Sequence, residues 1–171
     1  MECVFDTATR ESHLDNLRAS DAAMMPFGHT LGFRVERIVA GEAIVVVECR
    51  QDLHNIFGYA HGGAIFSIAD TAIGLAHIAS LTPSQTGTTV ESKINFLCPA
   101  LDGTLRAHAH CVKQGNSVSL YECDVFSEQN RHIARATATM MSLEDRRNEG
   151  RSRLYEMPCQ RATNSLDKEG M

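Results

Sequence analysis

Several protein classes leave signatures that this sequence lacks. Its net charge is −5, so the basic surface that is typical of nucleic-acid-binding proteins is missing. The longest uninterrupted aliphatic run, residues 43–47, is far shorter than the roughly 20 residues of a membrane-spanning helix. The first segment, MECVFDTATRESHLDNL, has no basic start followed by an apolar stretch and predicts no secretory signal. We therefore expect a cytoplasmic protein that binds neither nucleic acid nor a membrane.

Sequence motifs for metal and cofactor binding are also missing. None of the six cysteines lies in a C-x-x-C pair, and no ligand spacing joins them to the eight histidines. His77, His108 and His110 fit helix packing or strand alternation more simply than metal binding. No G-x-S-x-G, G-x-G-x-x-G or phosphate-loop pattern is present. We expect reduced, mostly buried thiols, no metal site and no cofactor.

The chain is long enough for one domain with a proper core, and 43% of its 171 residues are hydrophobic. Helical periodicity within residues 1–30 predicts a helix that ends near Met25-Pro26. The alternation in the first predicted strand places Phe33 and Val35 on one face and Ile38 on the other. The predicted strands cover residues 33–40, 42–50, 86–97, 103–113, 117–127 and 131–142, and one long helix covers residues 61–81.

One long helix against a mostly antiparallel sheet is an α+β architecture. We predict one domain over residues 1–143, with an N-terminal helical extension. Residues 144–171 are charged, turn-rich and poor in aliphatic side chains, so they are predicted to form a mobile tail.

The predicted long helix starts with two glycines and carries one acid. Gly62 and Gly63 leave backbone N–H groups uncovered at the positive end of the helix dipole, where a developing oxyanion is favoured. Asp70 is a carboxylate on an otherwise apolar helix, and a buried carboxylate without a partner is costly. Local physics leaves two interpretations open: Asp70 bonds neighbouring backbone, or it is kept for function.

A longer pattern surrounds these residues. The spacing Asn-x2-Gly-x2-His-Gly-Gly-x6-Asp over residues 55–70 is followed by Ile94-Asn95-Phe96 and by Lys113-Gln114-Gly115. Over residues 24–142 the chain resembles the hotdog-fold acyl-CoA thioesterases, most closely the phenylacetate-pathway (PaaI-like) branch. The resemblance implies a hotdog fold, in which one long central helix is wrapped by the sheet.

The resemblance also implies a role for each matching position. Asp70 corresponds to the family carboxylate that acts as general base or nucleophile, and Gly62 to the glycine whose amide polarises the thioester carbonyl. Asn55 and His61 correspond to neighbours that hold the carbonyl or stabilise the loop. Thr89 corresponds to a Ser or Thr that helps to place the water. The remaining implied contacts, with the substrate and its CoA moiety, fall on Gly63, Asn116 and Ser117.

The implied activity is hydrolysis of an aromatic or medium-chain acyl-CoA, as in phenylacetic acid degradation. Two other functions stay open: a non-catalytic acyl-CoA-binding or sensing module, and a hotdog hydratase or dehydratase. A helix that starts at Gly62 places Asp70 about 12 Å further along its axis. Both groups cannot then reach one carbonyl from the same chain. We therefore expect a homodimer with shared sites, assembled further into a homotetramer.

Overall fold

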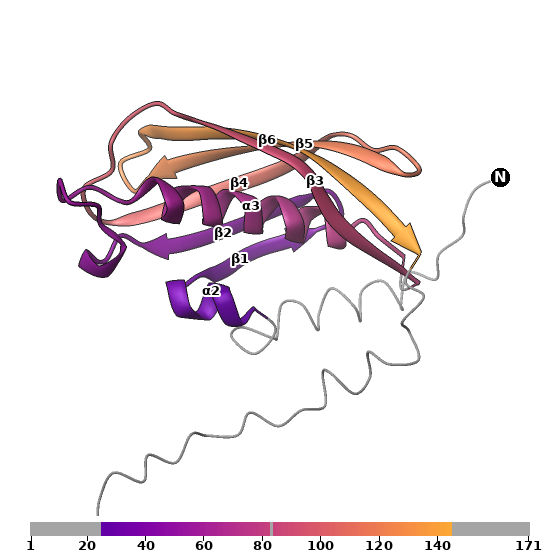
Figure 1. The fold of residues 1–171 in the computed structure, drawn as a ribbon, viewed down its shortest axis with the longest axis horizontal. Coiled ribbons are helices and arrows are strands. Elements are labelled where there is room, and N and C mark those ends of the chain that lie inside the picture. Colours follow the sequence, from indigo (N-terminus) through magenta and orange to yellow (C-terminus); the bar gives the residue numbers. More distant parts are fainter. Residues whose placement is uncertain (1–24, 83, 145–171) are drawn as a thin grey trace, which may run out of the picture.

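The computed structural model describes residues 25–82 and 84–144, and the account below is confined to them. In chain order (Figure 1) the elements are the helix α2 (Pro26–Leu31), the strands β1 (Arg34–Val39) and β2 (Glu42–Glu48), the 3-10 helix η1 (Gln51–Leu53), the helix α3 (Gly62–Ile78), and the strands β3 (Gln85–Phe96), β4 (Thr104–Lys113), β5 (Val118–Ser127) and β6 (His132–Glu144).

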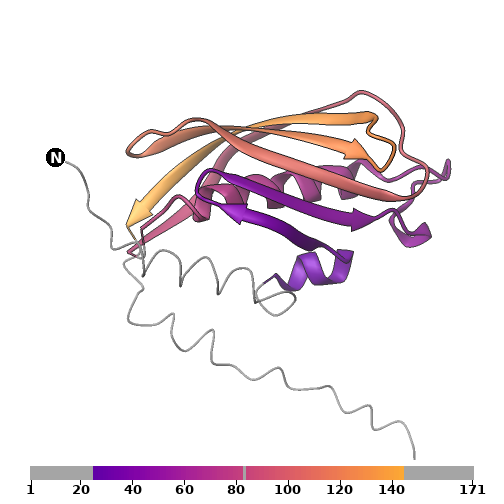
Figure 2. The ribbon, with the colours of Figure 1, turned by 180° about the vertical axis from the view of Figure 1, so that it is seen from behind.

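The strands form one antiparallel sheet that curves around α3. Their order across the sheet is β1-β2-β4-β5-β6-β3, so β1 and β3 are its edges. Figures 1 and 2 show α3 lying along one face of this sheet. The α+β class and the predicted order of strands and long helix are confirmed.

The inward side of α3 is small or aliphatic, which lets the helix lie close to the strands. Ile68 and Ile73 are fully buried, and burial of such a side chain stabilises a fold by about 1.5–3 kcal/mol. Between them, fully buried alanines leave room for the strands to approach the helix backbone. The outward side is only half-buried and consists of Phe66, Ser67, Asp70, Thr71, Gly74 and Ile78.

The first strand departs from the alternation predicted for it. Phe33 and Ile38 both lie in the core, so their predicted placement on opposite faces is wrong. The pairing of β1 with β2 shifts between Val35 and Arg37, which makes Glu36 an extra residue. Such a β-bulge turns the residues that follow it to the other face of the sheet.

A short helix begins where the sequence predicted one to end. Pro26 is the first residue of α2, a position at which its fixed φ and missing N–H are tolerated. The helix ends at Gly32, whose φ of 79° is the left-handed conformation that favours glycine. Met25 is the non-helical residue before α2, so α2 is a separate helix that was not predicted. The rest of that predicted helix and the predicted tail beyond Glu144 lie outside the described residues.

No helix in the described part of the chain is long and apolar enough to cross a membrane. The four described cysteines are free thiols: Cys123 is buried, and Cys49, Cys98 and Cys111 are half-buried. Burial raises the pKa of the Cys123 thiol well above its ordinary value, so this side chain serves the core as a small apolar group.

Candidate active site

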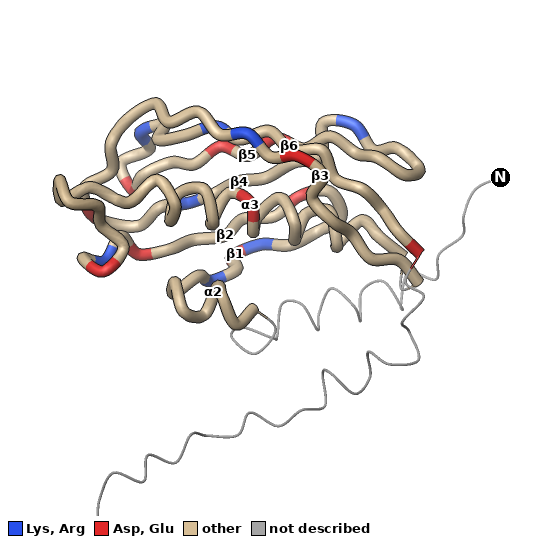
Figure 3. The backbone as a smooth tube through the Cα atoms, in the orientation of Figure 1, with Lys and Arg blue, Asp and Glu red and all other residues tan. Residues whose placement is uncertain are grey.

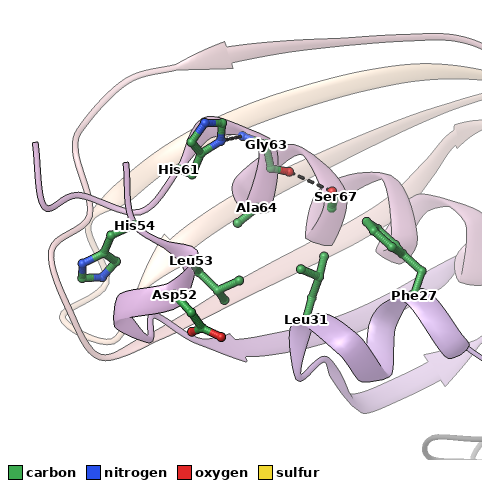
Figure 4. A pocket seen from close by; sticks show the side chains of 9 residues that line it. All are labelled: Phe27, Leu31, Asp52, Leu53, His54, His61, Gly63, Ala64 and Ser67. Carbon is green, nitrogen blue, oxygen red and sulfur yellow. Dashed lines mark hydrogen bonds between the residues drawn. The ribbon is translucent and has the colours of Figure 1, made fainter. Parts of the chain in front are cut away.

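The helix α3 begins with a histidine cap. His61 precedes the helix in an extended conformation, and its Nδ1 accepts a hydrogen bond from the Gly63 N–H at 2.9 Å (Figure 4). The Ala64 and Ile65 N–H groups donate to the His61 carbonyl oxygen at 2.9 and 3.2 Å. Within residues 25–82 and 84–144, nothing accepts the Gly62 N–H. Gly62 thus presents the one unfilled donor of the first turn, at the positive end of the helix dipole.

The space beside Gly62 is bounded by an aromatic ring. A Cβ atom at position 62 would lie 3.2 Å from Cζ of Phe96, the last residue of β3. The Phe96 side chain is half exposed and forms an apolar wall next to the amide. An N–H beside such a wall interacts more strongly with a developing negative charge, because less water screens it.

Asn55 organises the loop that leads to the helix. Its Oδ1 accepts hydrogen bonds from the Phe57 N–H at 2.9 Å and the Tyr59 N–H at 3.2 Å. The Asn55 N–H donates to the Tyr59 carbonyl at 2.8 Å, and Gly58 takes a φ of 80° to close the turn. Of the two roles that the resemblance implies for Asn55, stabilising the loop is the one its carboxamide oxygen performs in a single chain.

Asp70 is half-buried on the outward side of α3, about two turns after the helix start. It is the only Asp, Glu, Lys or Arg along α3 (Figure 3). The Thr89 hydroxyl on β3 hydrogen-bonds to its carboxylate. Thr89 reaches it because it pairs with the buried Met140 and so faces the side of the sheet that α3 covers. Asp70 and Thr89, both predicted site residues, therefore lie together.

The environment of Asp70 makes it a better base than an ordinary Asp. Burial raises the pKa of Asp70 above its usual value, and the hydrogen bond from Thr89 acts in the opposite direction. A carboxylate with a raised pKa accepts a proton from water more readily, provided that it stays ionised at the working pH.

The other predicted site residues are spread along the sheet. Asn116 and Ser117 are exposed in the turn between β4 and β5, which lies at the end of the sheet where β3 starts, with β6 between them. Gly62 lies against the opposite end of β3, so one chain does not bring it near this turn (Figure 1). Gly62 and Asp70 are also apart, by about 12 Å along the helix axis. A single chain therefore does not bring Gly62, Asp70 and the turn between β4 and β5 together.

A cavity of about 310 Å³ opens beside the start of α3 (Figure 4). Phe27 and Leu31 of α2 form one wall, and they are one helical turn apart. Sequence reasoning missed this wall, although Pro26 before it and Gly32 after it are signals of a short helix. The cavity is lined by Phe27, Leu31, Asp52, Leu53, His54, His61, Gly63, Ala64 and Ser67.

An arginine joins the two walls of this cavity. Arg50 donates from Nε and Nη2 to the Asp52 carboxylate, both at 3.1 Å, and from Nη1 to the Leu31 carbonyl at 3.2 Å. The hydrogen bond from Arg50 holds the pKa of Asp52 below its usual value. Asp52 is thus an ionised group whose two carboxylate oxygens are both bonded to Arg50. Through Arg50 it links η1 to the end of α2.

The histidines that were considered as metal ligands have other partners. His77 packs edge-on against Tyr121, and His108 contacts Glu42 at 3.1 Å. His110 lies 3.9 Å from Glu122. Among the described residues, no group of three or more His, Cys, Asp or Glu side chains is arranged to hold a metal ion.

Comparison with known proteins identifies the family to which the chain belongs. The family model of the Thioesterase superfamily matches residues 57–134. The acyl-coenzyme A thioesterase PaaI of Escherichia coli (strain K12) is 30% identical over 112 residues, which are 61% of this chain and 73% of that protein. The chain belongs to the thioesterase superfamily. It is a thioester hydrolase, and acyl-CoA thioesterase activity is supported at the level of the family.

Two further relatives of this thioesterase cover most of its described domain. The 1,4-dihydroxy-2-naphthoyl-CoA hydrolase of Listeria monocytogenes is 25% identical over 116 residues, 68% of this chain and 94% of the relative. A mutant structure of the phenylacetic acid degradation protein PaaI from Thermus thermophilus has a TM-score of 0.63 and 28% identity, covering 68% of this chain and 97% of that one. The fold is the hotdog thioesterase fold, as predicted.

Proposed function

We propose that this thioesterase hydrolyses an aromatic or medium-chain acyl-CoA, with the Gly62 N–H holding the carbonyl oxygen and Asp70 activating the attack. The observation that carries the proposal is the first turn of α3, where only Gly62 keeps a donor without an acceptor among the described residues. Such a donor, aimed at a developing oxyanion, is worth about 3–4 kcal/mol. A positioned general base contributes roughly 10²–10⁴-fold.

The chemistry requires no group beyond these. Asp70 takes a proton from a water molecule whose oxygen attacks the thioester carbon, and the carbonyl electrons move to the oxygen held by Gly62. When the tetrahedral intermediate collapses, the C–S bond breaks and the proton on Asp70 passes to the leaving thiolate. In the alternative route the carboxylate attacks the carbon directly and the C–S bond breaks as the thiolate leaves. Water then hydrolyses the resulting anhydride to free acid and Asp70 carboxylate, and the proton that this step releases passes to the thiolate. In both routes the Thr89 hydroxyl orients the carboxylate.

The separation of Gly62 and Asp70 supports a site shared between two copies of the chain. One carbonyl cannot lie about 3 Å from both groups when they are about 12 Å apart on one helix. β3 is an edge strand with exposed apolar side chains, Val90 and Phe96, which suits pairing with a second copy. Asn116 and Ser117 remain proposed contacts of the CoA moiety. Two such dimers would form the predicted homotetramer.

The cavity beside the helix start supports the choice of acyl group. Its walls are mainly apolar, and its lining includes His61 and Gly63, the residues on either side of Gly62. Its volume of about 310 Å³ is at the low end for small-molecule sites, which suits one aromatic ring system or a medium-length chain. The Listeria relative is named for an aryl-CoA substrate, and PaaI for phenylacetic acid degradation. We propose arylacetyl-CoA as the first substrate to test.

A pair of substitutions at Gly62 tests the proposal. Proline is favoured at the first position of a helix; it removes the N–H and adds a ring, and the extended backbone of His61 suits a residue before proline. Alanine adds the same Cβ near Phe96 but keeps the N–H. Release of free thiol from a panel of acyl-CoAs should fall by about 10²–10³-fold in Gly62→Pro, whereas Gly62→Ala should stay within a few-fold of the wild type.

The same panel decides between the proposal and the other two functions. Wild-type protein that binds acyl-CoA but releases no thiol would be the non-catalytic binding module. Consumption of the double bond of an enoyl-CoA without thiol release would indicate the hydratase. Equal activity of Gly62→Pro and Gly62→Ala would show that the Gly62 amide does not hold the carbonyl.

A further inference from the structure

At the start of α3, two glycines stand where the proposed function requires a donor of fixed direction. Gly62 and Gly63 follow each other, and glycine loses more conformational freedom on ordering than any other residue. The proposed oxyanion donor, the Gly62 N–H, lies in this pair. A hydrogen bond to a substrate oxygen needs a donor whose direction is fixed before the reaction.

One side chain restrains this pair. The His61 imidazole accepts the Gly63 N–H at 2.9 Å through Nδ1, and the His61 carbonyl accepts the next two N–H groups of the turn. The three N–H groups that follow Gly62 are thereby all held by His61. An imidazole that accepts through Nδ1 is neutral and carries its proton on Nε2.

We infer that His61 is a positioning residue for thioester hydrolysis: its imidazole caps Gly63 and so fixes the direction of the Gly62 N–H. This inference rests on the proposed function, because it assigns a task to His61 through the oxyanion donor. It also explains why only one first-turn donor is available. The cap occupies the Gly63 N–H and leaves the Gly62 N–H for the substrate.

The identity of residue 63 follows from the same contact. A Cβ atom at this position would lie 3.0 Å from Nδ1 and 3.4 Å from Cε1 of His61. The backbone of Gly63 does not have a positive φ, so conformation alone does not demand glycine there. Gly63 is needed because a side chain would push the imidazole away from the N–H that it caps.

Substitutions at His61 separate capping from contact with the substrate. His61 also lines the cavity, so an imidazole that touches the acyl group is the rival explanation. Asn and Ser are good N-caps that accept the same N–H, whereas Ala is not. His61→Ala should lower kcat by about tenfold with little change in KM, a fraction of the loss for a deleted donor. His61→Asn and His61→Ser should keep kcat within about threefold of the wild type.

A second set of variants keeps the inference testable if His61→Ala is unstable. Gly63→Ala should reduce kcat in the wild-type background but have little further effect in the His61→Ser background, because the clash with the imidazole is then absent. All rates are measured well below the thermal midpoint of each variant.

The outcomes are distinct. If His61→Asn loses activity as His61→Ala does, with a rise in KM, the imidazole contacts the substrate and the inference is wrong. If His61→Ala keeps full activity in an active enzyme, the cap has no role in positioning and the inference is also wrong. The proposed function fails separately, when Gly62→Pro retains activity or the wild type releases no thiol.

Discussion

At the residue scale, Asp70 is set apart from the other described acids by what surrounds it. It is half-buried on an apolar helix and bonded to a neutral hydroxyl, whereas Asp52 and Asp124 are paired with arginines. An arginine lowers the pKa of a carboxyl group and makes it a poorer base. Of these three, only Asp70 has a pKa raised by burial and no cation in contact to offset it.

Replacement of Asp70 tests this assignment. Asp70→Asn keeps the size of the side chain but cannot accept a proton, so kcat should fall by about 10²–10⁴-fold. Circular dichroism and CoA binding should stay as in the wild type. A suitable control is Glu122→Gln, an acid on the sheet face turned away from α3, which should keep its activity. Activity of Asp70→Asn within a few-fold of the wild type would exclude Asp70 as base or nucleophile.

Replacement of Thr89 should change the pH dependence of kcat/KM. Its hydrogen bond lowers the pKa of Asp70, so Thr89→Val should raise that pKa further. The reaction requires the ionised carboxylate, and the acid limb of the kcat/KM profile should therefore move to higher pH. Thr89→Ser, which keeps the hydroxyl, should leave the limb in place. A limb that stays or moves to lower pH in Thr89→Val would contradict the hydrogen bond.

At the scale of elements, the long helix and the strands were predictable because their signals are local. Hydrophobic period, small residues and turn residues placed α3 and its start at Gly62. The α2 wall of the cavity was not predictable in this way, because two residues such as Phe27 and Leu31 show no period. The bulge in β1 was missed for a different reason: it is a property of the pairing with β2, which no single strand encodes.

The candidate site shows the same division. Asp70 and Gly62 could be named from their places on the helix and from the family resemblance, and Thr89 from the resemblance alone. That His61 caps Gly63 could not, because histidine is not among the preferred N-caps and the contact depends on the ring's rotamer. The cavity could not be predicted either, since its walls come from three elements that meet only in the folded chain.

The far end of α3 carries a prediction on stability. His77 is 1% exposed, its Nδ1 lies 3.4 Å from the Tyr121 hydroxyl, and burial lowers the pKa of His77 below 6.5. Below about pH 6.5 the unfolded chain therefore binds a proton that the folded chain does not, so the free energy of unfolding falls as the pH drops. Above that pH this contribution is constant.

Urea unfolding at about pH 8 and about pH 5.5 measures the effect. His77→Gln is neutral at both values, so it should lose less stability between them than the wild type does. The difference between the two proteins isolates His77 from the other histidines. Equal losses would show that the buried imidazole takes up its proton as readily as in the unfolded chain.

At the scale of the whole molecule, the main feature is that β3 forms one edge of the sheet. This strand is long, and the side chains of Val90 and Phe96 on it are more than half exposed. Acidic and basic residues are interspersed over the sheet, so no block of one charge opposes a second copy (Figure 3). With Gly62 at one end of β3 and Thr89 near the middle of that strand, a two-fold partner could bring the missing half of each site.

Mixing two inactive variants tests whether the site is shared. In a dimer of one Asp70→Asn chain and one Gly62→Pro chain, one site keeps both functional groups and the other loses both. Random exchange at equal amounts makes half of the dimers mixed, so about a quarter of the wild-type activity should return. Asp70→Asn mixed with the Asp70→Asn, Gly62→Pro double variant should recover none, because no chain then supplies the carboxylate. Native mass spectrometry verifies the exchange. If exchange occurs without recovery, the carboxylate and the amide act within one chain, and α3 must then bend or unwind to bring them together.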